Sequence, residues 1–314
     1  MKYLNEILGI KYPIIQGGMA NIATGEFAAA CSNAGALGII ASGAMDAESM
    51  EREIRICRSL TDKPFGVNLM LMNEHTPELA QLVAREKVPV LTTGAGNPGK
   101  YMDLWKEAGI KVIPVSSSVT LARRLVREGA DAIIAEGCES GGHVGDMTTM
   151  ALTPQMVDGV DVPVIAAGGI AGGRQMAAAF ALGACGVQVG TCLLVSKECP
   201  IHENYKQALL KAKDNSTVVT GRSVQAPVRI LKNRMSREYI KQEMAGADKE
   251  TLERFTLGSL RKAVFEGDVH EGSLMAGQVC GQLKEIRPAA DIIKDLYEDA
   301  LARMKSMGSE AGRI

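Results

Sequence analysis

One unit recurs along the first two thirds of the chain: a short apolar run, a glycine or small polar residue, and then a stretch with helical periodicity. Most of the apolar runs carry valine and isoleucine on both faces, which is typical of strands that helices cover in a parallel sheet. The runs lie at residues 12–18, 36–43, 64–70, 88–96, 111–118, 131–137, 162–169 and 186–191.

This repetition predicts an α/β fold, a (β/α)8 TIM barrel, which typically needs about 250 residues. An open, doubly wound sheet is the alternative, but it usually has fewer strands and places its glycine-rich turn directly after the first strand. Here glycines follow several strands, and the late ones above all, so the barrel is favoured. We expect NYKQALLKAK (204–213) to form the last barrel helix.

The pattern changes past the eighth run, where the chain becomes helical and charged. We therefore expect a barrel domain at residues 1–222 and a C-terminal helical subdomain at residues 223–314. No low-complexity linker separates the two, so the subdomain is predicted to pack on the barrel and to contribute to the active site.

The composition excludes several classes of protein. The chain has 314 residues, 46% of them hydrophobic, so it can bury a substantial core, and its net charge of −1 gives no field that attracts nucleic acid or membranes. The seven cysteines form no C-x-x-C pair, which favours packing thiols, Cys138 included, in a reducing cytoplasm over disulfides or a structural zinc. Neither a signal peptide nor an apolar run of about 18 residues is recognised.

Glycines after the seventh and eighth runs are the first functional signal. In a barrel of this kind, ligand-binding groups lie at the carboxyl ends of the strands. Gly168 and Gly169 end the seventh run, and Gly190 and Thr191 end the eighth. Backbone N–H groups at such turns, together with a helix N-terminus, can bind a phosphate. The alternative is that these glycines only make tight turns.

His143 is the second signal. It lies in ESGGHVGDMTT (139–149), after the sixth run and among three glycines that leave it unshielded. Histidine is the side chain best able to move a proton near neutral pH, so His143 is a candidate proton-transfer residue. A surface histidine in a flexible loop is the alternative. Glu136, at the end of the sixth run, could bind ligand hydroxyls, orient a side chain or pair with a basic residue.

Seven motifs occur in order along nearly the whole chain: PIIQGGMA, PFGVNLML, TTGAGNP, AEGCESGGHVGDMTTM, VPVIAAGGIAGG, VQVGT and GSLMAGQ. Together they resemble the FMN-dependent barrel family that contains the type II enoyl-acyl-carrier-protein reductases and the nitronate monooxygenases. The third motif, the GGHVGDMTTM stretch and the last motif resemble the reductase branch more closely than the oxygenase branch.

The resemblance implies roles for particular residues. The isoalloxazine ring of FMN would be held by Gly17, Gly18, Met19 and Asn68. Its phosphate would be bound by Gly168, Gly169, Gly190 and Thr191, in agreement with the independent phosphate argument. The segment approaching the flavin from the helical part would be Met275, Ala276, Gly277 and Gln278. His143 matches the catalytic histidine, and Thr93 and Glu136 lie near the site without an assigned role.

The activity implied by the resemblance is the reduction of trans-2-enoyl-acyl-carrier-protein to the saturated form, the last step of the fatty acid elongation cycle. NADH or NADPH would supply hydride through FMN, and His143 would protonate the α-carbon or stabilise the developing negative charge. The alternatives are a nitronate monooxygenase, in which O2 accepts the electrons, and a flavin-storing or regulatory barrel without turnover. The resemblance also implies a homodimer and a response to a monovalent cation.

A carrier protein is acidic, so the enzyme is expected to present a basic docking surface. Residues 222–241 hold six cationic side chains against Glu238 alone. They are Arg222, Arg229, Lys232, Arg234, Arg237 and Lys241. We expect this segment to dock the carrier or a nucleotide phosphate, with a solvated helix face as the alternative.

Overall fold

The computed structural model of the chain describes residues 2–310 and contains a barrel of parallel strands. Around the barrel the strands follow the order β1-β9-β8-β6-β5-β4-β3-β2, and a parallel bridge between Ile15 and Leu37 joins the two ends of this sheet. The strands are β1 (Ile14–Gln16), β2 (Gly38–Ala41), β3 (Phe65–Met70), β4 (Val90–Gly94), β5 (Lys111–Ser116), β6 (Ile133–Glu136), β8 (Val164–Ala167) and β9 (Gly186–Val189). Each lies within one of the predicted apolar runs, so the TIM barrel is confirmed.

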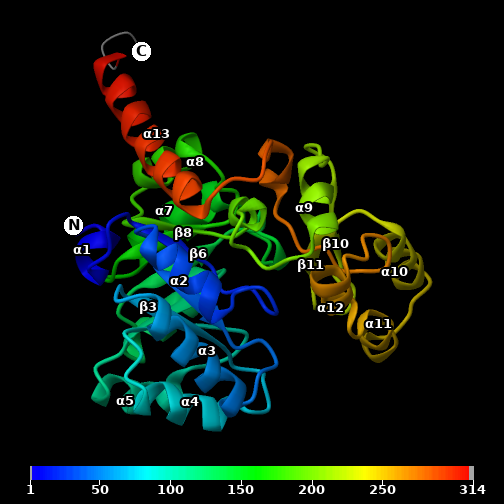
Figure 1. The fold of residues 1–314 in the computed structure, drawn as a ribbon, viewed down its shortest axis with the longest axis horizontal. Helices are drawn as coiled ribbons and strands as arrows, with labels where there is room; N and C mark the ends of the chain where they lie inside the picture. The colour runs from blue at the N-terminus through cyan, green and yellow to red at the C-terminus, as the bar shows by residue number, and fades with distance from the viewer. Residues whose placement is uncertain (1, 311–314) are drawn as a thin grey trace.

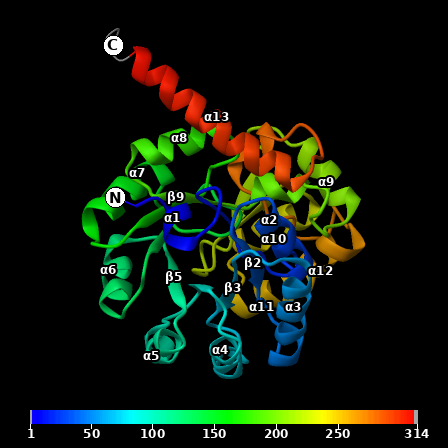
Figure 2. The same ribbon diagram turned by 60° about the vertical axis from the view of Figure 1, so that its left-hand side comes forward.

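Helices surround the strands, as Figure 2 shows. They are α2 (Gly25–Asn33), α3 (Ala47–Leu60), α4 (Thr76–Arg85), α5 (Gly99–Glu107), α6 (Val119–Arg127), α7 (Thr149–Gly159) and α8 (Gly173–Ala181). The short helix α1 (Leu4–Leu8) closes the amino-terminal end of the barrel, where Leu4 donates its N–H to Cys185 O at 2.9 Å. Because α1 covers that end, the opposite end is the one left for a site.

The eighth position in the helix layer belongs to α13 (Ala289–Glu310), which packs against α8 and α2 (Figure 1). The helix predicted for this position, α9 (Glu203–Leu210), forms but lies elsewhere. Its buried residues Tyr205 and Leu209 face the short helices η1 (Thr191–Val195) and η3 (Gln278–Gln282). The prediction was wrong because amphipathic spacing shows that a helix has a buried face but not which partner covers it.

Residues between η1 and α13 form a small unit beside the barrel, on the right of Figure 1. It contains β10 (Thr217–Thr220), β11 (Val228–Leu231), α10 (Arg234–Met244), α11 (Lys249–Thr256), α12 (Ser259–Arg261) and η2 (Lys262–Glu266). Ile230, Met235, Tyr239 and Leu252 form its core. We call this unit the cap. Residue 222, the domain boundary predicted from the sequence, lies inside the cap, between β10 and β11.

Candidate active site

A cavity of about 610 Å³ opens at the carboxyl ends of the barrel strands. This volume falls within the range of about 300–1,000 Å³ that is usual for small-molecule and cofactor sites. We call it the inner cavity. Eleven of the residues predicted for the site line it: Gly17, Gly18, Met19, Asn68, Glu136, His143, Gly168, Gly169, Gly190, Thr191 and Met275.

Two of the lining segments need glycine. A Cβ on Gly18 would lie 2.6 Å from Asn68 Cβ, so the loop after β1 packs against that side chain, which itself donates to Thr92 Oγ1 at 3.0 Å. Gly168 and Gly169 have φ of +91° and +72°, a region that side chains rarely adopt. These turns leave backbone N–H and C=O groups, rather than side chains, at the cavity wall, as a phosphate-binding turn requires.

Four of the predicted residues lie outside the inner cavity. Thr93 is buried in β4 beside Thr92, and because successive strand residues face opposite ways, it is Thr92 that supports Asn68. The other three follow Met275 and hold the cap against the barrel. Gly277 N donates to Thr191 Oγ1 at 2.9 Å and Gln278 N donates to Glu139 O at 2.9 Å. Ala276, Gly277 and Gln278 thus contact the loop that carries His143 and do not line the cavity.

The sequence motifs did not single out Gln188, which also lines the inner cavity from β9. A Cβ on Gly17 would lie 3.3 Å from the Gln188 side chain, so the two strand ends are in close contact. Its place in VQVGT, two residues before the predicted phosphate turn, is the signal that could have identified it.

The loop that carries His143 is fixed at its base by Glu139. The carboxylate of Glu139 accepts the N–H of Thr149 at 2.9 Å, at the first residue of α7, and the hydroxyl of Thr149 at 3.0 Å. The same hydroxyl lies 2.9 Å from Gly168 O. An acidic side chain at a helix N-terminus is stabilising. Because Thr149 binds both Glu139 and Gly168 O, it connects the histidine loop to the turn after β8.

Arg229 fixes the same loop from the cap. It lies on β11, is only 6% exposed, and donates from Nε and Nη2 to Cys138 O at 3.1 and 2.9 Å. Its Nη1 donates to Thr217 Oγ1 at 3.1 Å. The expectation that Arg229 belongs to an exposed docking surface is wrong, because strand alternation turns this side chain inward. Backbone pairing adds to the clamp: β7 (Gly142–His143) pairs antiparallel with β11, with His143 opposite Val228.

The other basic residues of segment 222–241 are largely neutralised. Arg222 pairs with Asp146 at 2.8 Å, Arg234 pairs with Glu271, and Lys241 lies 3.9 Å from Glu238. Within residues 2–310, Lys232 and Arg237 make no ion pair. Because three of these cations are already paired, the segment attracts an acidic partner only weakly. For most of this segment the structure therefore favours a solvated helix face over a docking surface.

Three titratable groups near the loop have pKa values shifted by burial. Desolvation by the surrounding protein lowers the pKa of the His143 imidazole. The residue is nevertheless exposed to the cavity. Burial raises the pKa of Glu136, against a smaller opposing effect of a hydrogen bond from Ser140. Burial likewise raises the pKa of the Cys138 thiol, which agrees with a packing role. Burial thus favours the neutral form of all three groups.

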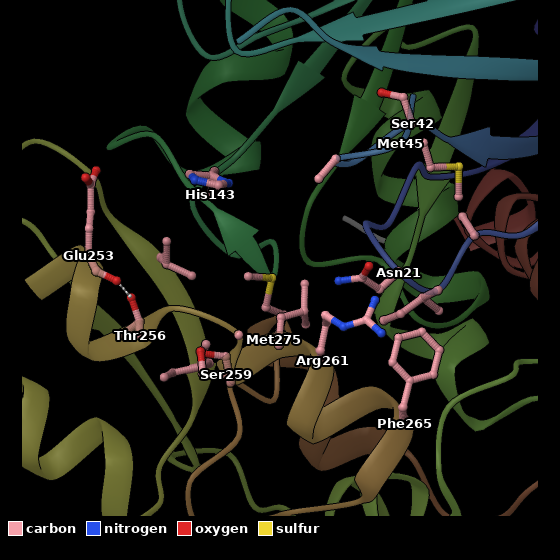
Figure 3. A pocket seen from close by; sticks show the side chains of 18 of the residues that line it. Asn21, Ser42, Met45, His143, Glu253, Thr256, Ser259, Arg261, Phe265 and Met275 are labelled. Carbon is pink, nitrogen blue, oxygen red and sulfur yellow. Dashed lines mark hydrogen bonds between the residues drawn. The ribbon is translucent and has the colours of Figure 1, made fainter. Parts of the chain in front are cut away.

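A second cavity, of about 850 Å³, lies between the barrel and the cap, and we call it the outer cavity. It is lined from the barrel by the loops after β1 and β2 and from the cap by β11, α10 and α12. The two cavities share Ile22, His143, Leu260 and Met275. Figure 3 shows His143 and Met275 at this junction, with Arg261 and Phe265 further along the wall. The imidazole thus borders both spaces.

Comparison with known proteins decides the family. The family model described as "Nitronate monooxygenase" matches residues 1–82 and 78–299. The chain belongs to the nitronate monooxygenase family. A probable nitronate monooxygenase from Staphylococcus saprophyticus is 33% identical over 87% of the chain and 90% of its own length.

Two further relatives cover nearly the whole chain. The solved structure of FabK from Thermotoga maritima is 46% identical, with a TM-score of 0.95, and the match covers 100% of both chains. A protein from Rhodococcus jostii named (3aS,4S,5R,7aS)-5-hydroxy-7a-methyl-1-oxo-octahydro-1H-indene-4-carboxyl-CoA dehydrogenase is 32% identical over 98% of the chain and 97% of its own length.

The family consists of FMN-dependent oxidoreductases, and the inner cavity fits that cofactor. Its glycine turns present backbone at the end of β8, and its volume suits a bound small molecule. Within residues 2–310, none of the helices is long and apolar enough to span a membrane.

Proposed function

We propose that this protein binds FMN in the inner cavity and reduces trans-2-enoyl thioesters, carried by acyl carrier protein, with NADH or NADPH as the electron donor. The observation that carries the proposal is the junction of the two cavities. His143 and Met275 border both, so a cofactor in the inner cavity and a substrate in the outer cavity would meet beside the imidazole.

The residues that would hold FMN fall into two groups. Gly17, Gly18, Met19 and Asn68 are proposed to contact the ring, and the turns at Gly168–Gly169 and Gly190–Thr191 to bind the phosphate. When bound, FMN would supply hydride transfer between the reduced nicotinamide and the β-carbon of the enoyl thioester. The apolar side chains Ile22, Leu260 and Met275 line both cavities and would limit the access of water at the junction.

His143 is proposed to act on the α-carbon side of the substrate. Its imidazole can donate a hydrogen bond to the thioester oxygen, where negative charge develops, or deliver a proton to the α-carbon. Its position is determined by Glu139, which binds Thr149 at the far end of the loop, and by Arg229 and β11, which hold the loop at Cys138 and at Gly142–His143. A proton-transfer residue held in this way typically contributes about 10²–10⁴-fold to the rate.

The relatives support the thioester substrate. FabK from Thermotoga maritima is 46% identical over the full length, compared with 33% for the relative named as a probable nitronate monooxygenase. The Rhodococcus jostii relative is named for a carboxyl-CoA substrate, which is also a thioester of a pantetheine arm. We propose acyl-carrier-protein as the physiological carrier; a homodimer and a monovalent cation stay predictions from the resemblance.

One observation is also compatible with the alternative, oxidation of alkyl nitronates with O2. Burial lowers the pKa of His143, and a neutral imidazole is the form that accepts a proton from a nitroalkane. A neutral imidazole can equally donate its N–H to a thioester oxygen, so the shift is compatible with both reactions.

Anaerobic reduction of the yellow protein tests the proposal. Without oxygen, NADH or NADPH is expected to bleach the flavin absorbance rapidly, and a trans-2-enoyl N-acetylcysteamine thioester is expected to restore it. Bleaching only by a nitronate, with no response to either nicotinamide, would establish the oxygenase instead. A preparation that contains no flavin and cannot be reconstituted with FMN would reject both reactions.

A further inference from the structure

Two arginines line the outer cavity, one from the barrel and one from the cap. Arg52 extends from α3 of the barrel, and Arg261 ends α12 of the cap. Neither makes an ion pair with a carboxylate in the part of the chain that the structure describes. The guanidinium of Arg261 lies 5.0 Å from the centroid of the Phe265 ring and extends toward Asn21 (Figure 3). Stacking on an aromatic ring holds the guanidinium in one orientation.

The carboxylates of the same cavity are already engaged. Asp46 accepts the N–H of Ser49 at 2.8 Å as the N-cap of α3, and Glu53 accepts the N–H of Gly25 at 2.6 Å. Glu253 lies 3.6 Å from Lys249 Nζ. These acids therefore already have partners, while neither arginine makes an ion pair within residues 2–310.

The two arginines are not equivalent. Arg52 lies close enough to Asp46 to contribute to lowering the pKa of that carboxyl, after the larger effect of the Ser49 hydrogen bonds. Asp46 thus offsets part of the positive charge of Arg52. Among the described residues Arg261 makes no ion pair, and it stacks on Phe265, so we take it as the main anion-binding group of the cavity.

We propose that Arg261, with Arg52 of the barrel as a second cationic group, binds the phosphate group of a ligand that enters the outer cavity. This inference rests on the proposed function, which brings two organic phosphates to the cavity: the 4′-phosphopantetheine arm of the carrier and the pyrophosphate of the nicotinamide dinucleotide. Both present the oxygen geometry that a guanidinium binds with two N–H groups. The apolar residues between Arg261 and His143, Leu260 and Met275, would contact the uncharged part of the ligand.

Calorimetric titration of the FMN-loaded protein tests the site without turnover. The probes are 4′-phosphopantetheine, pantetheine, which lacks the phosphate, and NADH. The wild type is expected to bind 4′-phosphopantetheine about tenfold tighter than pantetheine, and Arg261→Gln to abolish that difference. Arg261→Lys, which keeps the charge, is expected to retain part of it. Arg237→Gln is the matched control, because Arg237 is exposed on α10, makes no ion pair and lines neither cavity.

The probes that bind more weakly to Arg261→Gln identify which ligand supplies the phosphate. If Arg261→Gln weakens NADH about tenfold and leaves 4′-phosphopantetheine unchanged, the site exists and serves the dinucleotide. The inference is overturned if Arg261→Gln binds all three probes as the wild type does, or weakens pantetheine as much as 4′-phosphopantetheine. A protein that reduces no enoyl thioester but loses phosphate-dependent binding in Arg261→Gln would reject the proposed function and retain the site.

Discussion

Replacement of Arg229 by methionine separates two roles that the sequence leaves open, docking of a partner and support of the histidine loop. In the structure this guanidinium makes three hydrogen bonds and is 6% exposed. Two of these hydrogen bonds go to Cys138 O, and leaving a buried carbonyl oxygen without a partner costs about 1–3 kcal/mol. With the third bond included, we expect Arg229→Met to lower the free energy of unfolding by about 3 kcal/mol and, for a chain of 314 residues, the melting temperature by about 5 °C.

The assay is thermal unfolding of the FMN-loaded protein, followed by steady-state reduction of a short enoyl thioester. Arg237→Met is the control and should melt within about 1 °C of the wild type, because that side chain is exposed. A displaced loop should also reduce kcat with the short substrate. The reasoning is refuted if Arg229→Met melts like the wild type and only raises KM for the carrier-bound substrate, since that is the behaviour of a docking residue.

Three further predictions concern the inner cavity. His143→Ala should retain FMN, seen as an unchanged visible spectrum, and lose about 10²–10⁴-fold in kcat/KM; full activity would remove the role of the histidine. Because burial lowers the pKa of His143, the unfolded chain takes up this proton at a higher pH, so the contribution of His143 to stability is present above pH 6.5 and lost as the pH falls through the folded value. Denaturation curves of the wild type and His143→Gln, recorded from above pH 6.5 downward, give the free energy of unfolding at each pH. The wild type should lose more stability than the variant as the pH falls, and an equal loss in both would contradict this expectation. Gly168→Ala should lose FMN because φ is +91° and the new Cβ would lie 2.7 Å from Gly137 O, whereas Gly172→Ala, which has φ of −159° and meets only the Gln175 side chain at 3.4 Å, should keep the yellow colour. Equal flavin content in the two glycine variants would argue against a phosphate-binding turn at this position.

The sequence predicts local features well because each strand carries its own signal. The apolar runs at residues 64–70 and 162–169 became β3 and β8, and Ser118, a cap residue by type, accepts Leu121 N at 3.3 Å at the start of α6. A turn was expected at the glycines after β8, and both adopt positive φ there, a backbone that glycine adopts easily.

Partners distant in the chain were not predictable in the same way. Helices α9 and α13 have similar amphipathic patterns, and only packing against α8 and α2 determines that α13 completes the barrel. Arg229 looks like its basic neighbours in the sequence, and its inward orientation follows from the pairing of β11 with β7. The outer cavity is formed by segments from α3 and from the cap, so no single stretch of sequence indicates it.

The place of the cap in the chain couples the two cavities. Because the cap is inserted between β9 and α13, both of its ends are attached to the barrel. It is also joined to the histidine loop, through the pairing of Val228 with His143 and the bond from Gln278 N to Glu139 O. A movement of the cap that widened the outer cavity would therefore shift the imidazole relative to the inner cavity. Access to the outer cavity and the position of His143 are thus set by the same contacts. For this reason Arg229, which lines neither cavity, is expected to affect both stability and kcat.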